Sequence, residues 1–129
     1  MNSLVDTNVF LEILLGQSAS QRCQDFLDND PGANWISDFS LHSIGVLLFR
    51  KDRVELFRQF TADTLPQLII LTLSSAGYAE VIAARDKFDL DLDFDDAYQF
   101  CVAKEAGLAV ATQDKDFERV KAEIAVNFI

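Results

Sequence analysis

Short apolar runs alternate with segments of helical periodicity along the whole chain of 129 residues. Strands that are separated by helices pair in parallel through crossover connections, and helices then cover both faces of the sheet. The alternation therefore predicts an α/β fold with three layers, α/β/α, around a mostly parallel central sheet of about five strands. The predicted strands are residues 3–5, 35–37, 68–73, 108–111 and 126–129, of which 68–73 is the clearest buried strand.

The segments between these strands begin with side chains that cap helices well. Thr7 or Asn8 is expected to cap the first helix, and Gly107 to end the last long one. In the aspartate-rich stretch DLDLDFDDAY, residues 89–98, we expect a loop that leads into a helix with Asp95 as its N-cap. The predicted helices span residues 7–16, 18 or 20 to 27, 40–50, 54–60, 74 or 75 to 88, 95–107 and 116–125.

Composition limits the classes of function. Half of the residues are hydrophobic, so a folded core is expected, and the length suits a single domain over residues 1–129. Asp and Glu outnumber Lys and Arg by 21 to 11, and the resulting net charge of −10 opposes general binding to nucleic acid. A chain of this charge acts on phosphates where cations bridge its carboxylates to the substrate.

The two cysteines, Cys23 and Cys101, do not have the spacing of a metal site. Together with the lack of a signal-peptide pattern, they favour a reducing, cytoplasmic location. The longest apolar runs, such as residues 68–71, are far too short to span a membrane, so no membrane partner is expected.

Three aspartates stand where a parallel α/β fold places its ligands. Asp6 follows the first strand, Asp114 follows strand 108–111, and Asp96 lies in the first turn of the helix that leads into that strand. The carboxyl ends of parallel strands meet at one edge of the sheet, and helix N-termini favour carboxylates. Converging carboxylates repel one another unless a hard divalent cation lies between them, and such sites hydrolyse phosphodiesters.

Each aspartate also has a simpler interpretation. Asp6 and Asp95 are suitable helix caps, and Asp114 and Asp116 are suitable turn residues before the last helix. Residues 89, 91 and 93 fit a solvated loop. The joint placement of Asp6, Asp96 and Asp114, rather than any one of them, favours a metal site.

Three stretches resemble the PIN domain, the nuclease fold of VapC-type toxins: LVDTNVFLEIL, LDFDDAYQFCVAKEAGLAVATQDKDF and the closing VNFI. The resemblance covers nearly the whole chain. It implies that Asp6, Asp96 and Asp114 bind Mg²⁺ or Mn²⁺, and that Thr112 matches a Ser or Thr two residues before the last acid. It further implies a metal-dependent ribonuclease that cleaves RNA phosphodiester bonds, as the toxin of a type II toxin–antitoxin pair with a cognate antitoxin.

The chain departs from the family pattern at one position. PIN domains usually carry a glutamate on the third helix in a pattern like Ser-x-x-Thr-x-x-Glu, but here ISDFSLHSIG places Ser43 at that position, beside His42. The lost charge weakens a second metal site. His42 is then a candidate for phosphate contact or proton transfer, or simply a surface histidine, while Glu12 and Asp38 are candidate replacements for the acid; Asp38 also suits a helix cap.

The departure leaves a second function open, a catalytically weakened PIN-fold protein that acts as an RNA- or protein-binding module. Two other α/β families that use an aspartate after the first strand fit less well. A haloacid-dehalogenase-like phosphatase needs a second aspartate where this chain has Asn8, and a response-regulator receiver needs an acceptor aspartate and a lysine that are not evident.

The aromatic-rich helix at residues 54–60 contains Leu56, Phe57 and Phe60. Exposed apolar side chains mark interfaces, two-fold dimers are the commonest assembly, and PIN domains commonly dimerise. We therefore expect a homodimer; the alternative is that these side chains belong to the core.

Overall fold

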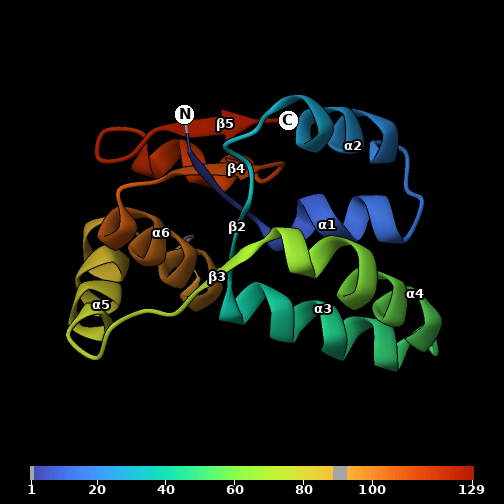
Figure 1. The fold of residues 1–129 in the computed structure, drawn as a ribbon. Helices are drawn as coiled ribbons and strands as arrows, with labels where there is room; N and C mark the ends of the chain where they lie inside the picture. Colours follow the sequence, from blue (N-terminus) through green and yellow to red (C-terminus); the bar gives the residue numbers. More distant parts are fainter. Residues whose placement is uncertain (1, 89–92) are drawn as a thin grey trace.

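The central sheet is parallel throughout and has five strands. The computed structural model describes residues 2–88 and 93–129, so Asp89 and Asp91 of the predicted loop lie outside the described residues. The strand order is β3-β2-β1-β4-β5, and each neighbouring pair is parallel (Figure 1), which confirms the predicted sheet. The strands are β1 Ser3–Val5, β2 Trp35–Ser37, β3 Ile69–Leu71, β4 Ala109–Thr112 and β5 Val126–Phe128.

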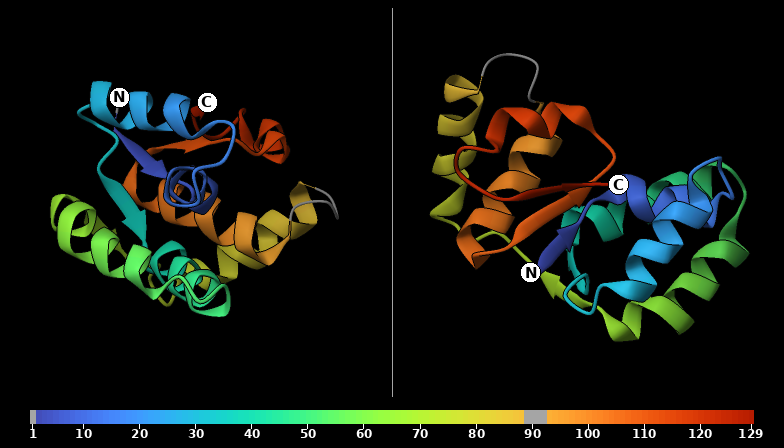
Figure 2. Two further views of the ribbon diagram at one scale, coloured as in Figure 1. Left: turned by 90° about the vertical axis from the view of Figure 1, so that its right-hand side faces the viewer. Right: turned by 90° about the horizontal axis from the view of Figure 1, so that it is seen from above.

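Helices cover both faces of this sheet. The α-helices are α1 Thr7–Leu14, α2 Ser20–Asn29, α3 Asp38–Arg50, α4 Val54–Gln59, α5 Gly77–Lys87 and α6 Phe94–Ala106. Shorter helical segments are the π-helix η1 Phe60–Thr64 and the 3-10 helices η2 Leu65–Gln67 and η3 Lys115–Val120. Figures 1 and 2 show α1 to α4 grouped on one side of the sheet, with α5 and α6 on the other.

Two hydrophobic cores hold these layers together. Successive side chains of a strand point to opposite faces, so Leu4 of β1 packs into the core with α5 and α6, whereas Val5 packs into the core with α1 and α3. Burial on both faces explains why the successive residues Leu4 and Val5 of β1 are both apolar. Among the described helices, none has the length and apolar character that a membrane span requires.

The expectation that residues 68–73 form the clearest buried strand is wrong. β3 is shorter, and Ile69 and Ile70 remain 44% and 47% exposed. The reason is position: β3 pairs with β2 alone and forms one edge of the sheet, beyond the cover of the helices. An apolar run predicts a strand, but it does not indicate whether that strand lies at the centre or at the edge of the sheet.

Several helix starts differ from the prediction because another nearby side chain makes the cap. Asp6, rather than Thr7 or Asn8, caps α1, and Asp93, rather than Asp95, caps α6 by accepting a hydrogen bond from the backbone N–H of Asp96. The third helix begins at Asp38 with Ser37 as its cap, and not at Ser40.

Near the C-terminus, one predicted element differs from the structure and one agrees with it. The predicted helix 116–125 is the 3-10 helix η3, capped by Asp114. Gly107 ends α6 as expected, with a φ of 70°, a left-handed conformation that glycine adopts without steric cost.

A matched pair of substitutions tests the different burial of β2 and β3. Ile36 and Ile70 are paired neighbours in the sheet, but Ile36 is 0% exposed. We expect Ile36→Ala to lower the free energy of unfolding by about 3 kcal/mol or more, because it leaves a cavity in the core. Ile70→Ala should lower it by about 1 kcal/mol or less. Urea unfolding measures both; equal losses would contradict the assignment of β3 as an exposed edge.

Candidate metal centre

The three predicted metal ligands line one cavity. Asp6 directly follows β1, Asp114 lies two residues beyond β4, and Asp96 stands in the first turn of α6. The parallel pairing of β1 with β4 brings the first two together at the carboxyl edge of the sheet. The cavity measures about 340 Å³ and is also lined by Thr7, Asn8, Leu11, Phe39, Ser43, Asp93, Asp95 and Asp116.

Asp96, Asp114 and Asp116 form the tightest group of acids in this cavity. One carboxylate oxygen from each lies within 4.8 Å of the others, which suits oxygen ligands around a shared divalent cation. Asp114 accepts a hydrogen bond from the backbone N–H of Asp116 at 2.9 Å, so the turn that starts η3 brings both acids to one place. In the described residues this group does not include Asp6.

Asp116 was not predicted as a ligand. The sequence analysis considered it only as a turn residue before the last helix, whereas in the structure Asp114 caps η3 and Asp116 is the second residue of η3. The two interpretations are compatible, because the cap that Asp114 supplies is what folds Asp116 back beside it. The Asp-x-Asp spacing of TQDKDF was the available signal for this pair.

Asp6 is held by four hydrogen-bond donors. Its Oδ1 accepts from the backbone N–H of Thr7 at 2.8 Å and from Nε2 of Gln99 at 3.0 Å. Its Oδ2 accepts from Oγ1 of Thr112 at 2.8 Å and from Nδ2 of Asn8 at 3.2 Å. Four donors match the four lone-pair positions of an ionised carboxylate, so Asp6 is fixed in orientation.

Thr112 connects Asp6 to Asp114. Its hydroxyl donates to Asp6 and accepts a hydrogen bond from the backbone N–H of Asp114 at 2.9 Å. The sequence prediction placed Thr112 at the site, and the structure shows this side chain buried between the two acids. Gln99 and Asn8 also contact Asp6 and were not predicted, since only the packing of distant segments brings Gln99 there.

Burial and the repulsion of neighbouring carboxylates raise the pKa values of Asp6 and Asp96. Asp6 is only 7% exposed, and its burial raises its pKa, against the lowering effect of hydrogen bonds from Gln99 and Thr112. Burial likewise raises the pKa of Asp96 to about 7, and the neighbouring negative charges add to the shift: Asp93, Asp114, Asp6 and Asp116. No Lys or Arg is among the described residues that line the cavity. A divalent cation would supply the missing positive charge.

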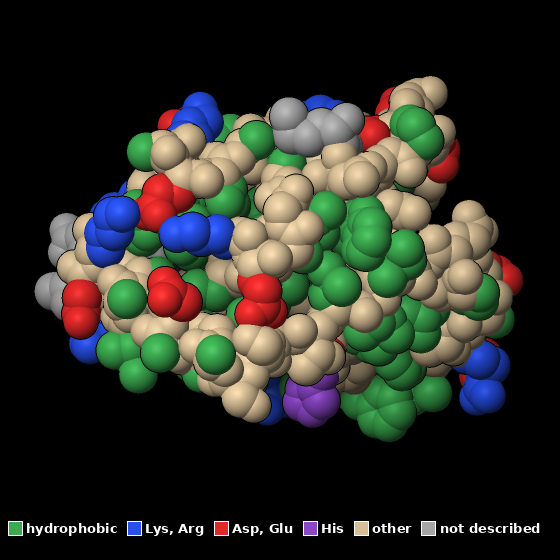
Figure 3. Space-filling model, turned by 60° about the vertical axis from the view of Figure 1, so that its left-hand side comes forward, with side chains coloured by type: hydrophobic (Ala, Val, Ile, Leu, Met, Phe, Trp, Pro, Cys, Tyr) green, Lys and Arg blue, Asp and Glu red, His purple; other side chains and the backbone are tan. Residues whose placement is uncertain are grey.

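Ser43 lines the cavity, as expected if it stands at the position of the family's glutamate. His42 does not line it. His42 is exposed and borders an apolar groove with Leu41, Gly45, Val46, Phe49 and Phe57. Figure 3 shows the only histidine of the chain at the surface, beside hydrophobic side chains.

The two candidate replacements for the missing acid also lie elsewhere. Oε2 of Glu12 accepts a hydrogen bond from the backbone N–H of Ala19, where α1 connects to α2. Oδ1 of Asp38 accepts from the Tyr98 hydroxyl at 2.6 Å, and Asp38 borders the same apolar groove as His42. Neither side chain lines the acidic cavity.

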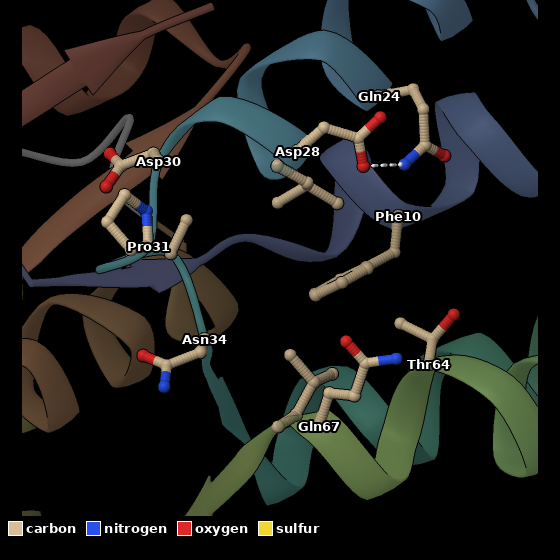
Figure 4. Close-up of a pocket in the computed structure, with 11 residues that line it drawn as sticks. Phe10, Gln24, Asp28, Asp30, Pro31, Asn34, Thr64 and Gln67 are labelled. Carbon is tan, nitrogen blue, oxygen red and sulfur yellow. Dashed lines mark hydrogen bonds between the residues drawn. The ribbon is translucent and has the colours of Figure 1, made fainter.

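A second cavity, of about 300 Å³, lies at the opposite ends of the strands, because Asn34 and Leu68 on its wall precede β2 and β3. Figure 4 shows Phe10 pointing into the space between α2 and the η1–η2 segment. The two acids that line this second cavity have hydrogen-bond partners close in sequence. Asp28 accepts from Nε2 of Gln24 at 2.8 Å (Figure 4), and Asp30 accepts from the backbone N–H of Gly32 at 2.9 Å. Among the described residues, the group of three acids close enough to share a cation lies in the first cavity.

Comparison with known proteins gives one family match and several similar folds. The family model of the PIN domain matches residues 3–123. No curated protein matches the sequence significantly. Among solved structures, FitAcB from Neisseria gonorrhoeae is similar with a TM-score of 0.80 and 24% identity, over 96% of this chain and 95% of that chain.

Two further structures are similar in fold. A toxin–antitoxin complex from Klebsiella pneumoniae has a TM-score of 0.70 and 22% identity, over 90% of each chain. The toxin VapC20 from Mycobacterium tuberculosis, described as cleaving the sarcin–ricin loop, has a TM-score of 0.71 and 17% identity, over 91% of this chain and 93% of that chain.

The raised pKa of Asp96 predicts a pH dependence of stability in metal-free protein. The folded state binds the proton of Asp96 more tightly than the unfolded state does. The free energy of unfolding that this preference supplies is therefore complete below the ordinary pKa of 3.8 and is lost as pH rises through about 7. Asp96→Asn should therefore stabilise the protein more at about pH 8 than at about pH 5. Urea unfolding with a chelator present measures this difference. Asp63→Asn, at an exposed position of η1, serves as the control. A pH-independent effect of Asp96→Asn would contradict the expected repulsion.

Proposed function

The chain belongs to the PIN-domain family, and we propose that it is a metal-dependent endoribonuclease that cleaves RNA phosphodiester bonds. The observation that carries the proposal is the convergence of Asp96, Asp114 and Asp116 in the cavity that Asp6 also lines. Oxygen ligands in a cavity that no described Lys or Arg lines suit a hard cation, Mg²⁺ or Mn²⁺. When bound, such a cation lowers the pKa of water and stabilises charge on a phosphate.

The residues of the chain have distinct roles in this proposal. Asp96, Asp114 and Asp116 would hold the cation, and Asp6 adds a fixed negative charge at the cavity wall. Thr112 fixes the positions of Asp6 and Asp114 relative to each other through its two hydrogen bonds. Ser43 offers a hydroxyl without charge, and His42 lies outside the cavity, so we assign no catalytic contact to His42. The strongly acidic chain approaches an RNA phosphate only with cations between them.

We also propose that the enzyme is the toxin of a type II toxin–antitoxin pair with a cognate antitoxin protein. Support comes from the family match and from the similar fold of the toxin–antitoxin complex from Klebsiella pneumoniae. A cytoplasmic location fits Cys23 and Cys101, which are buried free thiols. Co-purification with the product of a neighbouring small gene would support the pairing; unrestrained RNA cleavage with that product in excess would contradict it.

We also propose a homodimer, but its interface differs from the one expected at helix 54–60. Phe60 is a core residue, and Leu56 and Phe57 pack against the same core, so helix 54–60 is largely part of the fold. Large apolar side chains are instead exposed elsewhere: Phe49, Ile69, Ile70, Tyr78 and Ile82. Exposed apolar surface of this kind favours association. A monomer mass in light scattering at micromolar concentration would contradict the dimer.

The second candidate function, a catalytically weakened PIN-fold binding module, draws on one observation. Ser43 lines the acidic cavity at the place where the family pattern has a charged ligand, and neither Glu12 nor Asp38 replaces it there. The presence of six aspartates on that wall, among them Asp6, Asp96, Asp114 and Asp116, favours an active site instead.

An RNA cleavage assay distinguishes the two. Wild-type protein with Mn²⁺ or Mg²⁺ should cleave single-stranded RNA, and a chelator should stop it. Asp114→Asn should lower the cleavage rate by about a hundredfold or more, because loss of a ligand costs at least as much as loss of a residue that supports one. Asparagine caps helices as well as aspartate, so η3 should remain folded. Asp63→Asn controls for lost charge away from the cavity. Metal-dependent RNA binding without cleavage would favour the binding module.

A further inference from the structure

Gln99 is a polar side chain in a fully buried part of α6. It is 1% exposed, and its helical neighbours Tyr98, Phe100 and Cys101 belong to the hydrophobic core. Burial of an amide is unfavourable unless its donors and acceptor all find partners. A leucine or methionine would fill similar space without this requirement. The position therefore calls for an explanation beyond packing.

The amide of Gln99 is completely paired, and its orientation is fixed. Its Oε1 accepts from the Ser37 hydroxyl at 2.6 Å. Its Nε2 donates to Oδ1 of Asp6 at 3.0 Å and to Oγ of Ser40 at 2.7 Å. One terminal group must accept from Ser37 and donate twice on its other side, and an amide meets this requirement, whereas a carboxylate does not.

These bonds connect the starts of α1 and α3 with the interior of α6 around Asp6. Ser37 caps α3 by accepting from the backbone N–H of Ser40 at 3.0 Å, and Ser40 Oγ accepts from the Thr7 hydroxyl at 2.8 Å. Thr7 begins α1 and also donates its backbone N–H to Asp6. The position of the Asp6 carboxylate thus depends on the packing of α1, α3 and α6 together, and Gln99 makes the link between α6 and the other two.

We propose that Gln99 is a positioning residue of the metal centre, whose amide holds Oδ1 of Asp6 so that the carboxylate keeps one orientation in the acidic cavity. Thr112 and Asn8 restrain Oδ2, and without Gln99 the Oδ1 side would keep only the backbone N–H of Thr7. A fixed carboxylate gives the cation site its geometry before the cation arrives. Loss of a residue that orients an acid of a metal site typically lowers metal affinity by about 10- to 100-fold. The inference rests on the proposed cation site.

The alternative is that Gln99 serves stability alone, by satisfying Ser37 and Ser40. Tyr98 offers a matched control, because it is the adjacent buried residue of α6 and also makes hydrogen bonds, to Asp38 and to the backbone N–H of Leu73. Neither of these bonds reaches Asp6. Tyr98→Phe therefore removes buried hydrogen bonds from the same helix without loosening Asp6.

The test measures Mn²⁺ affinity and the melting temperature of metal-free protein for the wild type, Gln99→Leu and Tyr98→Phe. Electron paramagnetic resonance reports free Mn²⁺ and the zero-field splitting of bound Mn²⁺. We expect Gln99→Leu to weaken Mn²⁺ binding by about tenfold or more and to change the bound spectrum. Tyr98→Phe should lower the melting temperature while its affinity stays within about twofold of wild type. Gln99→Met, with a side chain of similar length, replaces Gln99→Leu if the latter does not fold.

Each outcome has a clear meaning. If wild-type protein does not bind Mn²⁺, the cation site of the proposed function fails, and this inference fails with it. If the wild type binds Mn²⁺ and the Gln99 variant binds it equally well with the same spectrum, the cation site stands and the role of Gln99 is overturned. Equal weakening by Tyr98→Phe would likewise overturn it, because general loss of stability would then account for the effect.

Discussion

Repulsion among carboxylates at one edge of the sheet is the constraint that the surrounding structure must offset. Helix starts supply part of the compensation, since Asp6 caps α1, Asp93 caps α6 and Asp114 caps η3. Backbone N–H groups at a helix start carry partial positive charge and stabilise these acids. The compensation is incomplete at Asp96, whose pKa is raised to about 7 by burial and by four neighbouring acids. The remaining imbalance is what a bound cation would remove.

A buried hydrogen-bond network holds two of these acids, Asp6 and Asp114, in defined positions. Asp6 connects through Thr112 to Asp114 on one side, and through Gln99 to Ser37 and Ser40 on the other. A buried network of this kind is favourable only when its members are all paired. Ser37, Ser40, Gln99 and Thr112 lie in β2, α3, α6 and β4, and Asp6 and Asp114 follow β1 and β4, so the site depends on correct packing of both faces of the sheet.

The sequence predicted the parts of this structure that depend on local pattern. Strands 3–5 and 35–37 have the predicted bounds, and Asp6, Asp96, Asp114 and Ser43 line the same cavity. The cap of α6 was misassigned because Asp93 and Asp95 are equally able to cap, and the choice depends on where the helix begins. His42 and Ser43 are adjacent, but successive helical residues differ by about 100° in direction, so only Ser43 lines the cavity.

Other features could not be read from local pattern. Gln99 contacts Asp6 across 93 positions of sequence, and the exposure of Ile70 depends on which strand lies at the edge. Both follow from tertiary packing.

The position of a bound cation tests the account most directly. Anomalous scattering from a crystal soaked in Mn²⁺ locates the ion without reference to activity. The account predicts a peak at the carboxyl edge of the sheet, within ligand distance of Asp96, Asp114 and Asp116. A peak elsewhere, for example beside Asp28 and Asp30 in the second cavity, or no peak among these acids in crystals that withstand the soak, would contradict the claim that they form the metal centre.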